Sequence, residues 1–153
     1  MPKCDFRGVI ENSPFVERSL KSMYPGTDEA ELPAKLEALA QRSPSAEEIR
    51  SEIRETEDEE ALALRMRDVR RRILVTLAAR DATGLGGYPE VVRVMTELAE
   101  ETIQAAVRCQ TRLLAERFGV PMSEEGVPQD LLVVGMGKLG GAELNVSSDI
   151  DLI

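Results

Sequence analysis

The sequence contains no histidine and no tryptophan, and its only two cysteines, Cys4 and Cys109, are far apart. Zinc sites and catalytic cysteine–histidine pairs are therefore excluded, because they need residue types that the chain lacks or separates. Aromatic residues make up only 3% of the chain. A core must then form from aliphatic side chains, which favours packed helices.

Positive charge is also scarce, since 19 Lys and Arg residues stand against 28 Asp and Glu residues, for a net charge of -9. Such a surface repels nucleic acid on average, so we expect no nucleic-acid partner. No apolar run approaches the length of a membrane span, and the N-terminus lacks the apolar stretch of a secretory signal. We therefore predict a cytoplasmic protein that does not contact a membrane.

Helical periodicity dominates residues 1–118, and 42% of the whole chain is hydrophobic. Ser13 followed by Pro14 predicts a helix start, and Ser45 with Glu48 has the spacing of a capping box. The acidic run 55–60 is interpreted as a solvated helix start, because negative charge is favoured there. Residues 1–118 therefore form the first of two predicted regions.

Two longer helices are predicted before residue 119, separated by a glycine-rich turn at 83–87, and we expect them to pack antiparallel. Each carries an apolar stripe at helical spacing. The first stripe comprises Leu62, Met66, Val69, Ile73 and Leu77, and the second comprises Val91, Met95, Leu98, Thr102, Ala106, Cys109 and Leu113. The opposite side of the first helix carries Arg65, Arg67, Arg71 and Arg72. We interpret this arginine face as solvated, with docking of an acidic partner as the alternative.

The pattern changes at Gly119. Residues 131–134 predict a buried strand that is apolar on both faces, and the alternation in residues 149–153 predicts a second strand. A glycine-rich loop lies between them. Because the chain stops inside the second strand, we expect it to be a fragment of a longer protein.

Asp149 and Asp151 are the candidate catalytic residues and metal ligands. Residues i and i+2 of a strand share a face, so their Cβ atoms are expected about 6–7 Å apart. Two carboxylates this close repel each other unless a divalent cation lies between them, and Mg²⁺ takes one or two carboxylates plus substrate phosphates. Alone, an Asp-x-Asp pair also fits an exposed strand face.

The preceding loop supports a phosphate-binding interpretation. Glycine lets backbone N–H groups approach phosphate oxygens closely, and a lysine adds positive charge. Hydroxyl groups directly before the first aspartate can orient it or donate to phosphate. The candidate nucleotide- and phosphate-binding residues are Gly135, Gly137, Lys138, Gly140, Gly141, Ser147 and Ser148. The spacing resembles a dinucleotide fingerprint only superficially, because no helix and acidic residue follow as that motif requires.

The stretch from Gly135 to Asn145, followed by Ser147 to Ile153, resembles the glutamine synthetase adenylyltransferase family almost residue for residue, within the superfamily that includes DNA polymerase β. Looser agreement extends back to about residue 62. The resemblance implies an α+β architecture in which residues 1–118 are a helical region and residues 119–153 begin a nucleotidyltransferase catalytic core. It also implies a longer enzyme with two such domains.

Members of that family attach AMP from ATP to a tyrosine of glutamine synthetase, or remove it by phosphorolysis with release of ADP. The resemblance is stronger to the N-terminal, adenylyl-removing domain. It implies Mg²⁺ or Mn²⁺ held by Asp149 and Asp151, with glutamine synthetase and a PII-type signalling protein as partners. The superfamily uses a third carboxylate from a later strand, for which Asp130 and Glu143 are poorly placed. We therefore expect the 153 residues alone to be inactive.

Two alternatives remain open. A minimal or antitoxin-type nucleotidyltransferase shares the glycine loop and the Ser-Asp-x-Asp segment, but it reaches them within its first few dozen residues. A helical interaction module, docking on a partner through residues 12–118, would make the C-terminal segment incidental. The residue types of the site do not determine the direction of adenylyl transfer.

Overall fold

The computed structural model describes residues 5–53 and 58–153. Cys4 and residues 55–57 of the acidic run 55–60 lie outside the described residues, although Asp58 caps the helix that follows by accepting from the N–H of Ala61. The elements in chain order are α1 (Phe6–Asn12), α2 (Pro14–Met23), a 3-10 turn (Glu29–Glu31), α3 (Leu32–Ala40), α4 (Ala46–Ile53), α5 (Glu59–Ala82), α6 (Tyr88–Phe118) and the short α7 (Gly137–Gly140).

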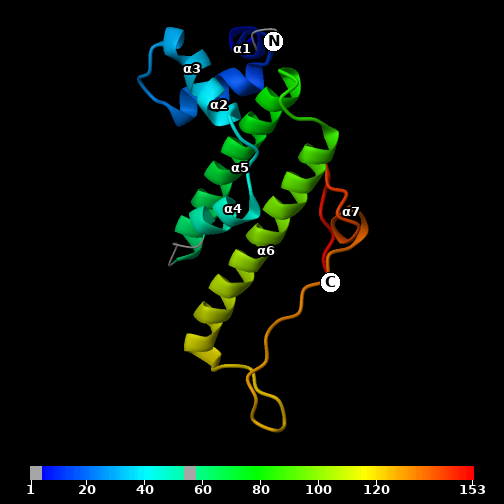
Figure 1. The fold of residues 1–153 in the computed structure, drawn as a ribbon. Helices are drawn as coiled ribbons and strands as arrows, with labels where there is room; N and C mark the ends of the chain where they lie inside the picture. Colours follow the sequence, from blue (N-terminus) through cyan, green and yellow to red (C-terminus); the bar gives the residue numbers. More distant parts are fainter. Residues whose placement is uncertain (1–4, 54–57) are drawn as a thin grey trace.

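Helices α5 and α6 are the predicted antiparallel pair and form the long axis of the molecule (Figure 1). Helices α1, α2 and α3 pack at the end where α5 turns into α6, and α4 lies against both long helices. After α6 the chain reverses and runs back along that helix, so that α7 lies beside its first half (Figure 1). The described structure is thus a helical framework with an extended segment along one side.

The short helices begin where the sequence predicts. Ser13 accepts a hydrogen bond from the N–H of Val16, and Pro14 occupies the first turn of α2. The capping box at α4 is confirmed: the N–H of Glu48 donates to Ser45 Oγ and the N–H of Ser45 donates to Glu48 Oε2, both at 3.3 Å. Each cap satisfies backbone donors that the helix leaves unpaired.

Arg80 ties the two long helices to α3. Its guanidinium donates to Glu90 at 2.8 Å, to the carbonyl of Ala40 at 2.7 Å and to the carbonyl of Leu85 at 2.9 Å. A planar guanidinium can serve several acceptors at fixed angles, which suits this junction. One side chain therefore holds the Gly-rich turn, the start of α6 and the end of α3 together.

The core falls into two clusters. One joins α1, α2 and α3 to the later part of α5, and the other joins α4, α5 and α6 to Leu139 and Leu144 of the C-terminal segment. The α5 stripe is confirmed as buried, except that Met66 is only partly buried. In α6 the predicted positions Met95, Leu98 and Cys109 are buried, as are Val94 and Ala105, which were not predicted. The remaining predicted positions are only partly buried: Val91, Thr102, Ala106 and Leu113. The buried face of α6 is shifted because α4, α5 and the C-terminal segment all pack on this helix.

The arginine face of α5 is only partly solvated, which corrects the sequence interpretation. Arg72 reaches Glu52 of α4 at 2.6 Å, and Arg71 donates to Ser22 at 3.1 Å. A second ion pair crosses from α4 to α6, where Arg50 binds the buried carboxylate of Glu101 through two hydrogen bonds of 2.6 and 2.9 Å. That carboxylate raises the pKa of Arg50 further above its ordinary value. The two ion pairs hold α4 against α5 and α6.

The predicted strands form only a single antiparallel bridge. Gly135 pairs with Leu152, the N–H of Val134 donates to the carbonyl of Ile153 at 2.7 Å, and the return bond measures 3.0 Å. The prediction of a buried strand at 131–134 is wrong in this structure, since Leu131 and Leu132 are 68% and 81% exposed. An apolar strand is buried only when further strands or a second layer cover it, and the described residues supply neither. The start of a sheet is therefore not shown.

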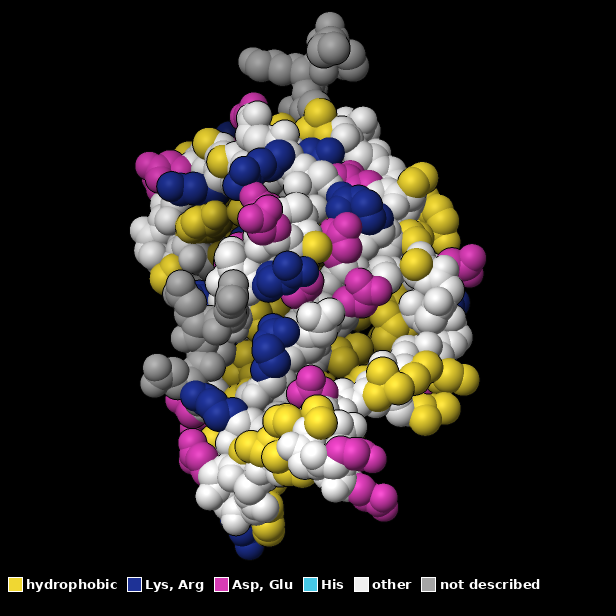
Figure 2. Space-filling model, turned by 60° about the horizontal axis from the view of Figure 1, so that its bottom comes forward, with side chains coloured by type: hydrophobic (Ala, Val, Ile, Leu, Met, Phe, Trp, Pro, Cys, Tyr) yellow, Lys and Arg dark blue, Asp and Glu magenta, His cyan; other side chains and the backbone are white. Residues whose placement is uncertain are grey.

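None of the helices in the described residues is long and apolar enough to cross a membrane. Figure 2 shows positive and negative side chains interspersed over the middle of one face, while hydrophobic side chains gather in patches toward its lower and right edges.

Candidate active site

The glycine-rich loop is a compact turn closed by its own backbone. The N–H groups of Leu139 and Gly140 both donate to the carbonyl of Met136, and the N–H of Gly141 donates to the carbonyl of Gly137 at 3.0 Å. Two of the predicted phosphate-binding residues, Gly140 and Gly141, thus have their amides engaged within the turn. The N–H groups of Gly137 and Lys138 have no acceptor in the described part of the chain. The N–H of Gly135 also has no acceptor there, so three of the predicted phosphate-binding residues have a free backbone donor.

Two of the glycines are required by close packing. A Cβ added at Gly140 would lie 2.4 Å from the carbonyl oxygen of Gly135, and one added at Gly135 would lie 2.8 Å from Leu139 Cγ. Gly137 has a φ of +53°, a left-handed conformation that side chains with a Cβ rarely adopt. The loop geometry therefore depends on glycine at these positions, whether or not a phosphate binds there.

Two leucines anchor the loop to the helical framework. Leu139 and Leu144 are 7% and 2% exposed and belong to the core cluster of α4, α5 and α6. Lys138, directly before Leu139, is exposed and has no ion pair within the described residues. The free amides of Gly137 and Lys138 thus belong to exposed residues that come directly before a buried anchor.

Asn145 organises the segment that leads into the aspartates. Its side-chain oxygen accepts hydrogen bonds from the N–H of Ser147 at 3.0 Å, from Ser147 Oγ at 3.1 Å and from Ser148 Oγ at 3.0 Å. The N–H of Asn145 in turn donates to Ser148 Oγ at 3.2 Å. Sequence reasoning included Asn145 in the motif but not among the site residues. The Asn-x-Ser-Ser spacing is the signal that could have identified it, because Asn side chains commonly bond backbone two residues on.

Asp149 and Asp151 are both exposed, and neither forms an ion pair or hydrogen bond through its carboxylate within the described residues. Ser148 and Ile150 line a cavity between α5 and α6, and Leu152 lines a second cavity beside α6, although Ile150 and Leu152 are themselves 43% and 44% exposed. Neither aspartate lines either cavity. The alternation expected of an extended chain is therefore present here. Two unpaired carboxylates on solvent are a donor set that fits Mg²⁺ or Mn²⁺, with substrate oxygens completing the shell.

No group of three or more carboxylate, thiolate or imidazole side chains gathers anywhere in residues 5–53 and 58–153. Asp130 and Glu143 accordingly do not join the two aspartates. The described residues therefore bring no third carboxylate to Asp149 and Asp151.

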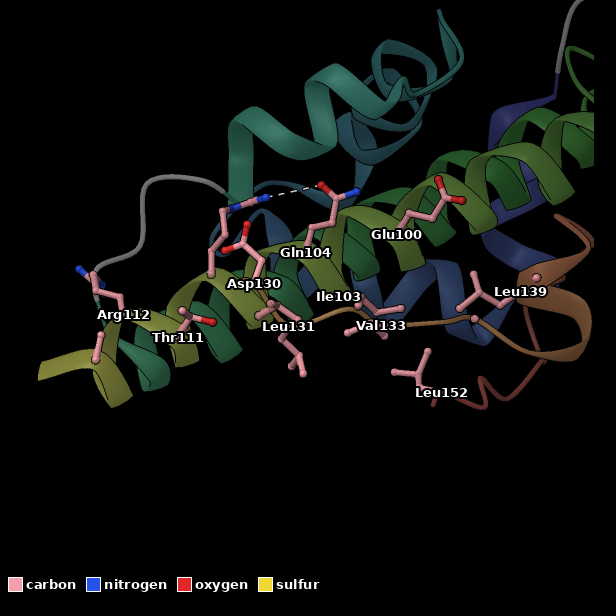
Figure 3. Close-up of a pocket in the computed structure, with 15 residues that line it drawn as sticks. Glu100, Ile103, Gln104, Thr111, Arg112, Asp130, Leu131, Val133, Leu139 and Leu152 are labelled. Carbon is pink, nitrogen blue, oxygen red and sulfur yellow. Dashed lines mark hydrogen bonds between the residues drawn. The ribbon is translucent and has the colours of Figure 1, made fainter. Parts of the chain in front are cut away.

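The larger cavity, of about 840 Å³, runs between α6 and the extended segment (Figure 3). Ile103 and Thr111 of α6 form one wall, while Leu131, Val133 and Leu152 form the other (Figure 3). Asp130 lies at its margin, close to the Arg108–Gln104 hydrogen bond that Figure 3 marks. The cavity is mainly apolar, and Gly135 and Gly140 of the glycine-rich loop line it, whereas neither aspartate does.

A family model described as glutamate-ammonia ligase adenylyltransferase matches residues 4–153. The chain belongs to this family. Its relatives include a bifunctional glutamine synthetase adenylyltransferase/adenylyl-removing enzyme of Aromatoleum aromaticum, 47% identical over 96 residues, which is 63% of this chain and 10% of that protein. A protein of the same description from Nitrosomonas europaea is 48% identical over 100 residues, covering 63% of this chain and 11% of that protein.

The chain thus spans about a tenth of the length of the relatives it matches. No solved structure matches the chain. The family assignment confirms the resemblance carried by the loop and the Ser-Asp-x-Asp segment, while the roles of individual site residues stay predictions.

Proposed function

We propose that the chain provides the metal-binding segment of a nucleotidyltransferase that removes AMP from a tyrosine of glutamine synthetase by phosphorolysis. The observation that carries the proposal is the exposed, unpaired pair Asp149 and Asp151 on an extended segment, in a chain of the adenylyltransferase family. The names of the relatives support glutamine synthetase as the target. The closer resemblance to the N-terminal domain of the family supports removal rather than attachment, and a PII-type signalling protein is the regulatory partner we expect.

In this proposal Asp149 and Asp151 hold Mg²⁺ or Mn²⁺, which when bound supplies positive charge against the transferring phosphoryl group. The free N–H groups of Gly137 and Lys138 donate to phosphate oxygens, and the Lys138 ammonium adds charge on the same side of the loop. Ser147 and Ser148 hold the backbone before Asp149 through Asn145, so that the first carboxylate is presented in one orientation. Gly135, Gly140 and Gly141 keep the loop compact enough for this arrangement.

The metal test uses this chain and manganese alone. Mn²⁺ binding, followed by electron paramagnetic resonance, is expected to weaken at least tenfold in the Asp149→Asn, Asp151→Asn variant, because both anionic ligands become neutral amides. Asp130→Asn is the matched control, being an exposed carboxylate outside the segment, and is expected to change binding less than twofold. Equal Mn²⁺ affinity in the wild type and the double variant would overturn the metal assignment.

The activity test has two arms. The 153-residue chain, with adenylylated glutamine synthetase, phosphate and Mg²⁺, is expected to release no ADP, because the third carboxylate is missing from the described ligand set. A longer protein that continues this sequence is expected to release ADP and to lose that activity in the double variant. A longer protein that instead only consumes ATP and releases pyrophosphate would assign attachment, not removal, to this segment.

A further inference from the structure

A small cavity of about 280 Å³ lies between α5, α6 and the turn that precedes the aspartates. Its floor is apolar and includes Met95, Leu98 and Leu144. Arg67 and Arg70 of α5 line its rim, three residues apart and hence on one face of the helix. No aspartate or glutamate lines the cavity, although the chain carries a net charge of -9. Its only charged lining groups are therefore positive.

These two arginines differ from others on the same helix. Arg71, Arg72 and Arg80 each bind a carboxylate. In the part of the chain that the structure describes, Arg67 and Arg70 form no ion pair and donate no hydrogen bond. Two guanidinium groups without partners, next to one cavity, are suited to a planar or tetrahedral oxyanion, because each can donate two parallel bonds.

The turn adds a further donor. The side-chain oxygen of Asn145 is occupied by three hydrogen bonds, whereas its amide nitrogen has no acceptor among the described residues. The hydroxyl of Thr102, which also lines the cavity, is likewise without a partner there. Ser148 is different, because its proton is already donated to Asn145. The free lining groups are thus donors: two guanidinium groups, one amide and one hydroxyl.

We propose that this cavity is a phosphate-binding site formed by Arg67, Arg70, Thr102 and Asn145. The ligand class is a phosphate oxyanion, either as inorganic phosphate or as the phosphoryl group of an adenine nucleotide. A volume of about 280 Å³ suits a small anion better than a whole nucleotide, since drug-sized ligands occupy pockets of roughly 300–1,000 Å³. Arg67 and Arg70 are exposed, so an anion can reach them from solvent.

The site adjoins the aspartates without including them, since Ser148 lines the cavity and Asp149 is the next residue. An anion held here lies beside the segment that presents the carboxylates. The assignment of this anion as the phosphate of phosphorolysis rests on the proposed function. The binding of phosphate itself is independent of that function, because it requires neither a metal ion nor the two aspartates.

The binding test titrates inorganic phosphate into the ¹⁵N-labelled chain, with EDTA present and ionic strength held constant with chloride. The wild type is expected to show saturable shifts of amides around residues 66–70, 102 and 145–148. The Arg67→Ala, Arg70→Ala variant is expected to bind at least tenfold more weakly. Arg65→Ala is the matched control, an exposed arginine on the same helix that does not line the cavity, and is expected to change affinity less than twofold.

Two further variants separate chemistry from structure. Arg67→Lys with Arg70→Lys keeps the charges but loses the paired donors, so an intermediate affinity is expected. Thr102→Val keeps the shape and loses one donor, so a two- to threefold loss is expected. Equal phosphate affinity in the wild type and the double alanine variant, or shifts confined to other parts of the chain, would overturn the site.

The source of the phosphate is distinguished by parallel titrations with AMP and adenosine. Tighter binding of AMP than of inorganic phosphate, with the same arginine dependence, assigns the site to a nucleotide phosphoryl group. Adenosine binding as tightly as AMP would overturn the proposal, because the apolar floor and not the donors would then recognise the ligand. In EDTA the Asp149→Asn, Asp151→Asn variant is expected to bind phosphate as the wild type does. A failure of the metal test therefore does not contradict the phosphate site. Likewise, a failure of the phosphate test does not contradict the metal assignment.

Discussion

The helical region 5–118 and the segment 119–153 of one chain use apolar residues in opposite ways. In the helical region, side chains such as Ile73, Val94 and Leu36 are fully buried. In the segment only Leu139 and Leu144 are buried, while residues such as Leu132 and Ile153 are largely exposed. Because helices satisfy their backbone hydrogen bonds locally, the first region can complete a core with neighbouring helices. A strand needs partner strands and a covering layer, and the segment has only two isolated bridges, Met122 with Pro128 and Gly135 with Leu152.

The largest expected effect contrasts a core position with an exposed one. Ile73→Ala, at a fully buried site in α5, is expected to lower the free energy of unfolding by about 2–5 kcal/mol, because a cavity remains. Leu132→Ala, at a site that is 81% exposed, is expected to change it by less than about 0.5 kcal/mol. Urea unfolding followed by circular dichroism measures both. Similar losses at the two positions would erase the contrast between the regions.

An intermediate effect is expected in the glycine loop. Gly140→Ala places a Cβ 2.4 Å from the backbone oxygen of Gly135, so the turn must open, at a cost of about 1–3 kcal/mol. We expect faster amide hydrogen exchange at residues 139–143 and unchanged exchange in the helices. Gly87→Ala is the control, since nothing lies within 4 Å of its added Cβ. Unchanged amide exchange in Gly140→Ala would contradict the close approach of Gly140 to the carbonyl oxygen of Gly135.

The smallest expected effect concerns the turn before the aspartates. Asn145→Ala removes the acceptor of three hydrogen bonds and is expected to destabilise the turn by about 1 kcal/mol, because these bonds are partly exposed. Mn²⁺ binding is expected to weaken two- to fivefold, since the backbone that leads into Asp149 is then less constrained. Asn12→Ala is the control, an exposed asparagine in α1 whose side chain donates to the carbonyl of Gly8 at 2.8 Å. A loss of Mn²⁺ affinity as large as that of the double aspartate variant would make Asn145 a ligand rather than an organiser.

Sequence reasoning succeeded where structure is local. The capping box of Ser45 and Glu48, the start of α2 at Pro14 and the α5 stripe depend on residues three or four positions apart, and all three are present. It failed where a contact joins distant positions. Glu101 was not expected to be buried, because its partner Arg50 lies 51 residues away on another helix.

The candidate site divides in the same way. The aspartates, the lysine and the glycines were identified from their spacing, and the family match supports that interpretation. The cavity beside them was not identified, because Arg67, Thr102 and Asn145 come from three separate parts of the chain. Among the α5 arginines, only the packing of α4 distinguishes Arg72, which binds Glu52, from Arg67, which stays available.

By itself, the sequence determined the two long helices, the caps at Ser13 and Ser45 and the glycine turn at 83–87, since each follows from neighbouring residues and their backbone preferences. Only the tertiary structure decided which charges are neutralised, which face of α6 is buried and which donors remain free beside the aspartates. Such properties depend on what a second element brings to within a few ångströms, and no local pattern contains that information. The apolar strand at 131–134 shows the same dependence, since its burial requires neighbours that residues 5–53 and 58–153 do not supply.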